Sequence, residues 1–292
     1  MKKIIAAAVA TAFAAPVMAV DVTISGEVET TYTSSNGANN MSQGTQDITV
    51  SFSDTLANGM EVSGFVRNDS ANGTVAQDSA LTISGEFGSI QVGKEAGKGG
   101  DQFDDVSDVA SGGSGADAEI NDGVATSASV QYTPNLGVNG LTATVGYSAA
   151  SSGTNTEVVG YGLKYANDMF SLAYGAMDSD DSSLKTATIV SATVNMGPVF
   201  IGVDSSSKIA GVDGDDSVAV GVTYTLGDMV FEYETMTTED DTNVDATDTV
   251  IGITYNVGAG LQVYVAADTN ETAGASSVTE AESTIVGVEY KF

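Results

Sequence analysis

Apolar and polar residues alternate along most of the chain, in short runs separated by polar or Gly-containing connections. A period of two puts Val22, Ile24 and Val28 on one face of an expected strand, and Thr23 and Ser25 on the other. The same alternation recurs in residues 141–147, 218–226, 251–257, 261–267 and 284–292. The pattern predicts an all-β chain. It fits a soluble sandwich with apolar faces inward equally well as a transmembrane barrel with apolar faces toward lipid.

The lengths of the connections separate these two folds. Short connections alternate with longer polar ones along the chain. The short connections are at residues 54–59, 87–89, 134–140, 167–168, 197–198, 227–228 and 258–260. The longer ones are at 34–46, 68–78, 97–126, 149–157, 178–184, 204–216, 236–248 and 268–282. Such a series joins about sixteen strands, an even number that suits an antiparallel barrel with all its long loops at one end. A sandwich has no reason to place every long loop at one end. We therefore expect a transmembrane antiparallel β-barrel.

The start of the chain predicts export. Lys2 and Lys3 precede an apolar run, and small residues follow near Ala19, which is typical of a secretory signal peptide over residues 1–19. No later apolar stretch reaches the roughly 18 residues of a transmembrane helix. An exported chain of this kind can still cross a membrane as a closed barrel. We expect one barrel domain over residues 20–292.

Composition narrows the function. The formal net charge is −30, and without residues 1–19 seven basic residues remain against 39 acidic ones. Arg67 is the single arginine, so no basic surface for nucleic acid is expected, and the acidic excess favours attraction of cations. The chain has no Cys and no His, which excludes thiolate chemistry, Ser-His-Asp catalysis and His-bearing zinc sites.

Several stretches resemble the general diffusion porins of Gram-negative bacteria. They are DVTISG at 21–26, LANGMEV at 56–62, LTISGEFGSIQVGK at 81–94, SASVQYTP at 127–134, NGL at 139–141 and YKF at 290–292. The resemblance implies an outer-membrane barrel of sixteen strands, a homotrimer, and a water-filled channel for passive diffusion of ions and small hydrophilic solutes. It also implies outer-membrane lipid and the barrel-assembly machinery as partners. Tyr290 and Phe292, at the aromatic end of the last strand, would be the signal that this machinery reads.

The resemblance further implies that a long third loop folds into the pore and forms a constriction between acidic and basic groups. The loop after the strand ending near Lys94 would supply the acids, and the bases would stand on the barrel wall. Candidate acids are Asp101, Asp104, Asp105 and Asp108, with Asp117 and Glu119 as weaker ones, and candidate bases are Lys94, Arg67 and Lys98.

This chain departs from the family in its scarcity of bases. No cation stands near Thr49, Val50 or Gln131, where related porins often place wall bases. We therefore expect a predominantly negative, cation-selective constriction, because carboxylates in a low-dielectric pore favour cations. The alternative is that the acids of the loop only keep it hydrated or bind Ca²⁺ there.

Other acidic groups have less specific interpretations. The runs at 178–181, 213–216 and 239–241 resemble oxygen-ligand clusters for loosely bound Ca²⁺ or Mg²⁺, but none matches the twelve-residue Ca²⁺ loop. We expect no tightly bound cofactor. Glu232 and Glu234 share the polar face of one expected strand, as a lumen lining or as a glycosidase pair. A non-enzymatic pore is the leading interpretation, and a secreted acidic β-sandwich serving adhesion or a surface layer is the alternative.

Overall fold

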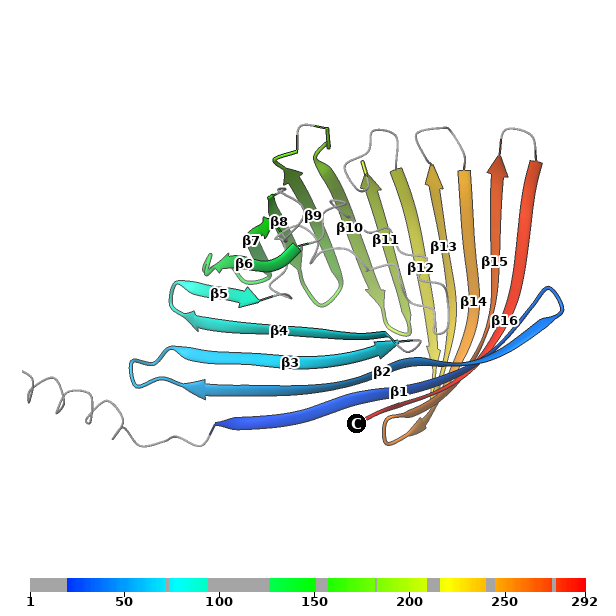
Figure 1. Cartoon of the computed structure of the whole chain (residues 1–292), viewed down its shortest axis with the longest axis horizontal. Helices are drawn as coiled ribbons and strands as arrows, with labels where there is room; N and C mark the ends of the chain where they lie inside the picture. Colours follow the sequence, from blue (N-terminus) through cyan, green and yellow to red (C-terminus); the bar gives the residue numbers. More distant parts are fainter. Residues whose placement is uncertain are drawn as a thin grey trace, which may run out of the picture.

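The chain folds into a closed barrel of sixteen antiparallel strands (Figure 1). The computed structural model describes residues 20–71, 74–93, 126–150, 157–181, 183–208, 216–239, 245–274 and 277–292. Each strand pairs with its neighbours in sequence, and β16 pairs with β1 to close the wall. Within these residues, no helix is long and apolar enough to cross a membrane. The predicted barrel and strand number are confirmed, and the closed wall rules out the two-sheet sandwich.

The strands differ in length around the wall. The first eight are β1 (Asp21–Ser35), β2 (Ala38–Thr55), β3 (Glu61–Ala71), β4 (Thr74–Gly85), β5 (Gly88–Gly93), β6 (Thr126–Pro134), β7 (Leu141–Ala150) and β8 (Val158–Ala166). The others are β9 (Phe170–Ser179), β10 (Ala187–Met196), β11 (Val199–Ser207), β12 (Asp216–Leu226), β13 (Met229–Glu239), β14 (Asp245–Gly258), β15 (Leu261–Gly274) and β16 (Ser277–Lys291). We call the end of the barrel with the short connections the turn end, and the opposite end the loop end.

The two faces of the wall are the reverse of those in a soluble sheet protein. Apolar side chains such as Val22 and Ile24 point outward and are 59% and 65% exposed, whereas Glu234 and Asp204 point inward and are 0% exposed. A wall with apolar residues outside and polar residues inside is the pattern of a transmembrane barrel. On the outside, the rings of Tyr165 with Phe170, Tyr224 with Phe231, and Tyr290 with Phe292 lie about 6 Å apart near the turn end.

The first and last strands meet along a seam of nine residue pairs. Residues 27–35 of β1 pair with residues 283–291 of β16, and Figure 1 shows the C-terminus beside the blue β1 ribbon. Beyond these pairs, Gly26 and Phe292 exchange two backbone hydrogen bonds of 3.0 Å. Gly26 leaves room for the Phe292 ring, because a Cβ there would lie 2.8 Å from the ring carbon Cζ. Phe292 therefore ends on the outer surface of the wall.

Three of the expected long loops are wrong, because strands occupy most of them. Residues 34–46 are the top of the β1–β2 hairpin, which turns at Asn36 and Gly37 alone, and β3, β4, β15 and β16 extend into 68–78 and 268–282. Asn36 and Gly37 have φ values of 48° and 81°, as in the tight turns that suit twisted hairpins. Polar and small residues predominate in the sequence of these stretches, so no clear alternation marks them, but the backbone ladder continues.

Candidate functional site

The inner face of the barrel carries most of the charged groups that the strands bring together. Inward positions alternate with the outward apolar ones, so every second residue of a strand lines the lumen. The inward acids are Glu27, Glu29, Asp47, Asp78, Asp204, Glu232, Glu234, Asp248, Asp268 and Glu289, and the inward bases of the described strands are Arg67, Lys164 and Lys291. Acids thus far outnumber bases on the lumen wall.

Arg67, one of the candidate constriction bases, lies on this wall and bonds to an acid on the next strand. Arg67 of β3 and Asp78 of β4 are directly opposite each other, and Arg67 Nη2 donates to Asp78 Oδ2 at 2.9 Å. The Asp78 side chain is 6% exposed and that of Arg67 is 37% exposed. The charge of Arg67 is therefore largely balanced where it stands.

Lys291 is a second wall base with acidic neighbours. Its Nζ lies 3.6 Å from Glu27 Oε2 of β1 and also contacts Glu289, its neighbour on the same face of β16. Glu289 in turn accepts a hydrogen bond from Gln262 of β15. This group spans the seam and carries a net negative charge. Glu289 and Lys291 alternate with the apolar residues of the last strand, and this alternation is the sequence signal for their place in the lumen, where no role was predicted for them.

Lumen-facing side chains differ in burial around the wall. Most of the fully buried ones, with less than 2% exposed surface, are on β7 to β14, whereas the inward Glu27, Asp47 and Arg67 of β1 to β3 are partly exposed. The largest fully buried inward side chains, all on β7 to β14, are those of Thr144, Ser148, Val158, Met177, Ile189, Ser191, Asp204, Glu234 and Val250. Protein atoms therefore cover the lumen face of β7 to β14, and the more open surface lies on the side of β1 to β3.

A small apolar cluster interrupts this polar lining. Val158, Met177, Ala187 and Ile189 pack together on β8 to β10, with Leu184 against them. Val158, Met177, Ala187 and Ile189 all lie on inward positions that simple alternation would give to polar residues. The lumen is thus polar and acidic on most of the wall, with one apolar area toward the loop end.

Most of the predicted constriction lies outside the described residues. Lys94, Lys98, Asp101, Asp104, Asp105, Asp108, Asp117 and Glu119 all fall in the segment 94–125. This segment connects β5, which ends at Gly93, to β6, which begins at Thr126. Of the predicted constriction residues, the structure places Arg67 alone. Tyr290 and Phe292, the predicted assembly signal, lie outward at 44% and 52% exposure.

The acidic run at 178–181 is used for local hydrogen bonds. Asp178 accepts from the Thr186 hydroxyl, and Asp180 accepts from the Glu157 amide. Asp181 Oδ1 accepts from the amide and the hydroxyl of Ser183. These two hydrogen bonds lower the pKa of the Asp181 carboxyl in this exposed loop. The run thus shapes a loop.

The other two acidic runs are described only in part. Asp216 accepts a hydrogen bond from the Lys208 amide and Glu239 ends β13, whereas 213–215 and 240–241 lie outside the described residues. Across the part of the chain that the structure describes, no group of three or more acids is arranged to hold a metal ion.

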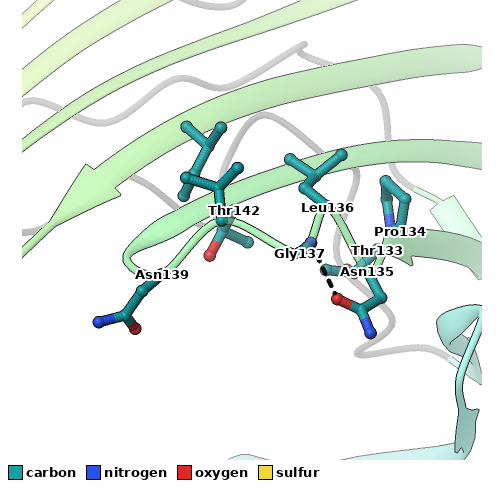
Figure 2. A pocket seen from close by; sticks show the side chains of 9 residues that line it. Thr133, Pro134, Asn135, Leu136, Gly137, Asn139 and Thr142 are labelled. Carbon is teal, nitrogen blue, oxygen red and sulfur yellow. Dashed lines mark hydrogen bonds between the residues drawn. The ribbon is translucent and has the colours of Figure 1, made fainter.

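A cavity of about 280 Å³ lies at the turn between β6 and β7 (Figure 2). Its lining residues, 133–139, 141 and 142, are all uncharged. Asn135 Oδ1 accepts a hydrogen bond from the Gly137 amide across the turn, and Leu136 points away from the two asparagines labelled beside it. The cavity has no group that could do chemistry on a ligand, so the lumen is the candidate site.

Comparisons with known proteins give the same fold. A family profile of Gram-negative porins matches residues 6–275. OmpTdeltaL8, a loop-deletion mutant of an outer membrane protein of Vibrio cholerae, is 16% identical, and the match covers 94% of this chain and 100% of that one with a TM-score of 0.70. A triple mutant of the Rh. blastica porin is 15% identical, and the match covers 93% of this chain and 100% of that one with a TM-score of 0.72.

A third similar structure is described as an anion-selective porin from Comamonas acidovorans. It is 14% identical, the match covers 94% of this chain and all of that one, and the TM-score is 0.70. No curated protein matched the sequence. The profile match spans most of the chain and agrees with the closed sixteen-stranded wall, its outward apolar face and its acidic lumen. The chain therefore belongs to the Gram-negative porin family, whose members are non-enzymatic diffusion channels of the outer membrane.

Proposed function

We propose that this outer-membrane diffusion channel passes small hydrophilic solutes and selects cations over anions. The observation that carries the proposal is the excess of carboxylates on the lumen wall. Two of the inward bases, Arg67 and Lys291, already contact acids within 4 Å. Fixed negative charge inside a low-dielectric wall raises the local concentration of cations and lowers that of anions.

The fold alone does not set the sign of selectivity. The Comamonas acidovorans porin is described as anion-selective and has the same overall fold at a TM-score of 0.70. The sign must therefore come from the charges that each chain places in its lumen. In this chain Asp204 of β11, Glu232 and Glu234 of β13, and Asp248 of β14 all face inward.

We propose further that the segment 94–125, the third loop, folds into the lumen and forms the constriction. The fully buried inward side chains of β7 to β14 support this arrangement, because a hollow barrel with nothing inside would leave them accessible to water. The segment begins at β5 and ends at β6, next to the wall that is covered. Asp101, Asp104, Asp105 and Asp108 would then stand at the narrowest point, with Lys94 and Lys98 near the wall.

The test is the reversal potential of the purified channel in a planar bilayer under a salt gradient. The wild-type chain should give stable conductance steps and a potential of the sign expected for cations. Replacing Asp101, Asp104 and Asp105 together with Asn should lower the cation preference, because three fixed charges leave the constriction. We expect the permeability ratio of cation to anion to fall by about threefold to tenfold, equivalent to roughly 1 kcal/mol.

Glu271→Gln is the matched control, since Glu271 lies on β15 facing outward and its loss leaves the lumen unchanged. An equal shift of the reversal potential in the control would show that selectivity depends on the total charge of the protein, and that the acids of the loop have no special role. A wild-type reversal potential of the anionic sign would reject cation selectivity altogether. An unchanged potential in the triple variant would reject the role of these three acids.

We also propose a homotrimer, the usual assembly of this family, and an assembly role for the outward aromatic pair Tyr290 and Phe292. The pair is accessible on the outer surface, with ring centroids 6.0 Å apart. Light scattering of the detergent-solubilised protein measures the assembly state, and a monomeric mass would contradict the trimer. Replacing Phe292 with Ser should reduce the amount of folded barrel in the membrane, with unchanged amounts counting against the role.

A further inference from the structure

Side chains from four consecutive strands meet inside the barrel where the wall closes. Tyr264 of β15 stands directly opposite Gly287 of β16 and is 4% exposed. Its hydroxyl passes beyond Gly287 and donates a hydrogen bond to Glu29 Oε1 of β1. The contact thus joins the strand before the seam to the strand after it.

Two glycines make the space for these side chains. A Cβ on Gly287 would fall inside the ring of Tyr264, and a Cβ on Gly44 of β2 would overlap the carboxylate of Glu29. Neither glycine has a positive φ, so the requirement at both is room for a neighbour. Tyr264 therefore lies flat across β16, and Glu29 lies flat against β2.

Glu29 also accepts a hydrogen bond at an irregularity in the pairing of β1 with β2. The register of β1 and β2 shifts between Val28 and Thr30, so that Glu29 of β1 stands opposite two residues of β2, Gly44 and Thr45, as in a β-bulge. The Thr45 amide donates to Glu29 Oε2 at 3.1 Å. One carboxylate thus accepts from β15 with one oxygen and from β2 with the other.

We propose that Tyr264, Gly287, Glu29 and Gly44 form a clasp that fixes the register of the closing seam. A slip of one residue between β1 and β16 would turn every side chain of one strand to the opposite face. The clasp forms in one register only, because the Tyr264 ring needs glycine directly opposite it and Glu29 on the same face. Tyr264 is a positioning residue in this proposal, since it keeps Glu27, Glu29 and Glu289 on the lumen side.

The first test removes the Tyr264 hydroxyl and keeps its ring. We expect Tyr264→Phe to lower the ratio of folded to unfolded barrel in urea about tenfold, the usual order for a hydrogen bond to a charged group. Deuterium exchange followed by mass spectrometry should rise at the amides of β1 and β16 and stay unchanged at β8 and β9. Tyr255→Phe is the control, because Tyr255 on β14 faces outward and is 46% exposed.

The second test is a double-mutant cycle between ring and glycine. Gly287→Ala should displace the ring and reduce folding by more than tenfold, whereas in a Tyr264→Ala background the same change should be neutral or favourable. If Gly287→Ala does not fold at all but the double variant with Tyr264→Ala does fold, that result also supports the clasp. Additive effects in the cycle, or exchange that rises equally in all strands of Tyr264→Phe, would overturn it.

Discussion

The effect of a single charged lumen residue on ion selectivity depends on whether a neighbouring group of opposite charge already balances it. Arg67 is bonded to the nearly buried Asp78, so the pair contributes little net charge to the lumen. If Arg67 loses its charge, the lumen wall becomes one unit more negative. The same residue that opposes cation selectivity thus also anchors β3 to β4.

We predict that Arg67→Gln raises the cation preference of the channel. Loss of the Arg67 charge makes the lumen wall one unit more negative, which should increase the permeability ratio of cation to anion by about twofold to threefold, as expected for under 1 kcal/mol of added attraction. The reversal potential in a salt gradient measures this change. Lys185→Gln removes the same charge from an exposed loop between β9 and β10 and should have little effect. A lower cation preference in Arg67→Gln would contradict the prediction.

At the scale of an element, the β1–β2 hairpin depends on two residues with unusual backbone geometry. Its strands run from Asp21 to Ser35 and from Ala38 to Thr55, and only Asn36 and Gly37 connect them. A φ of 81° is accessible to Gly at no cost, but it strains a β-branched residue. The turn therefore fixes the register of one of the longest ladders in the barrel.

We predict that Gly37→Val destabilises the barrel by about 1–2 kcal/mol, the cost of the left-handed conformation for a residue with a Cβ. Urea unfolding of the protein in lipid vesicles measures the change. Ala38→Val adds the same side chain to the next residue, which is in a strand, and should be neutral. Equal loss in both variants would mean that side-chain bulk, and not backbone strain, is responsible.

At the scale of the whole molecule, the lumen acids act together through the field they create in the pore. The wall outside them is apolar, as the exposure of Val22, Ile24 and Leu172 illustrates, so it does not screen that field. Salt in the pore does screen it. The Debye length falls from about 30 Å at 0.01 M salt to about 3 Å at 1 M.

We therefore predict that cation selectivity is strong in dilute salt and largely lost near 1 M. The measurement is the reversal potential at a fixed concentration ratio, repeated at mean concentrations that span this range. A preference that stays constant across the range would mean that cations are selected by direct contact at one site, and that the distributed charge has little influence.

The strand number could be predicted from the series of short and long connections, and the apolar and polar faces of the strands from local alternation. The segment 34–46 could not be assigned in that way, since polar residues stand on both faces of the hairpin, Asn39 and Gln43 on one face and Asn40 and Ser42 on the other. Asn36-Gly37 was the local signal for the tight turn. The apolar Ile189 and Val158 on the lumen face depart from alternation because other protein atoms cover them.

The pore lining was predictable only in part. Arg67 lies on the lumen wall, and its bond to Asp78 depends on the register of β3 and β4, which no local pattern reveals. The contact between Tyr264 and Glu29 joins residues 235 positions apart, and no local pattern carries such information. The acids of the segment 94–125 stay predictions.

The order of pairing around the wall has a kinetic consequence. Fifteen strand pairs join neighbours in the sequence, and only the pair of β1 with β16 joins the two ends. Loop closure over the 235 positions from Glu29 to Tyr264 costs on the order of 3 kcal/mol more entropy than closure over the 11 from Thr31 to Ser42. Hairpins can therefore form one after another at low entropic cost, and the seam should be the last and slowest ladder to form. Until then, the edges of β1 and β16 present unpaired backbone groups that any other strand could bind.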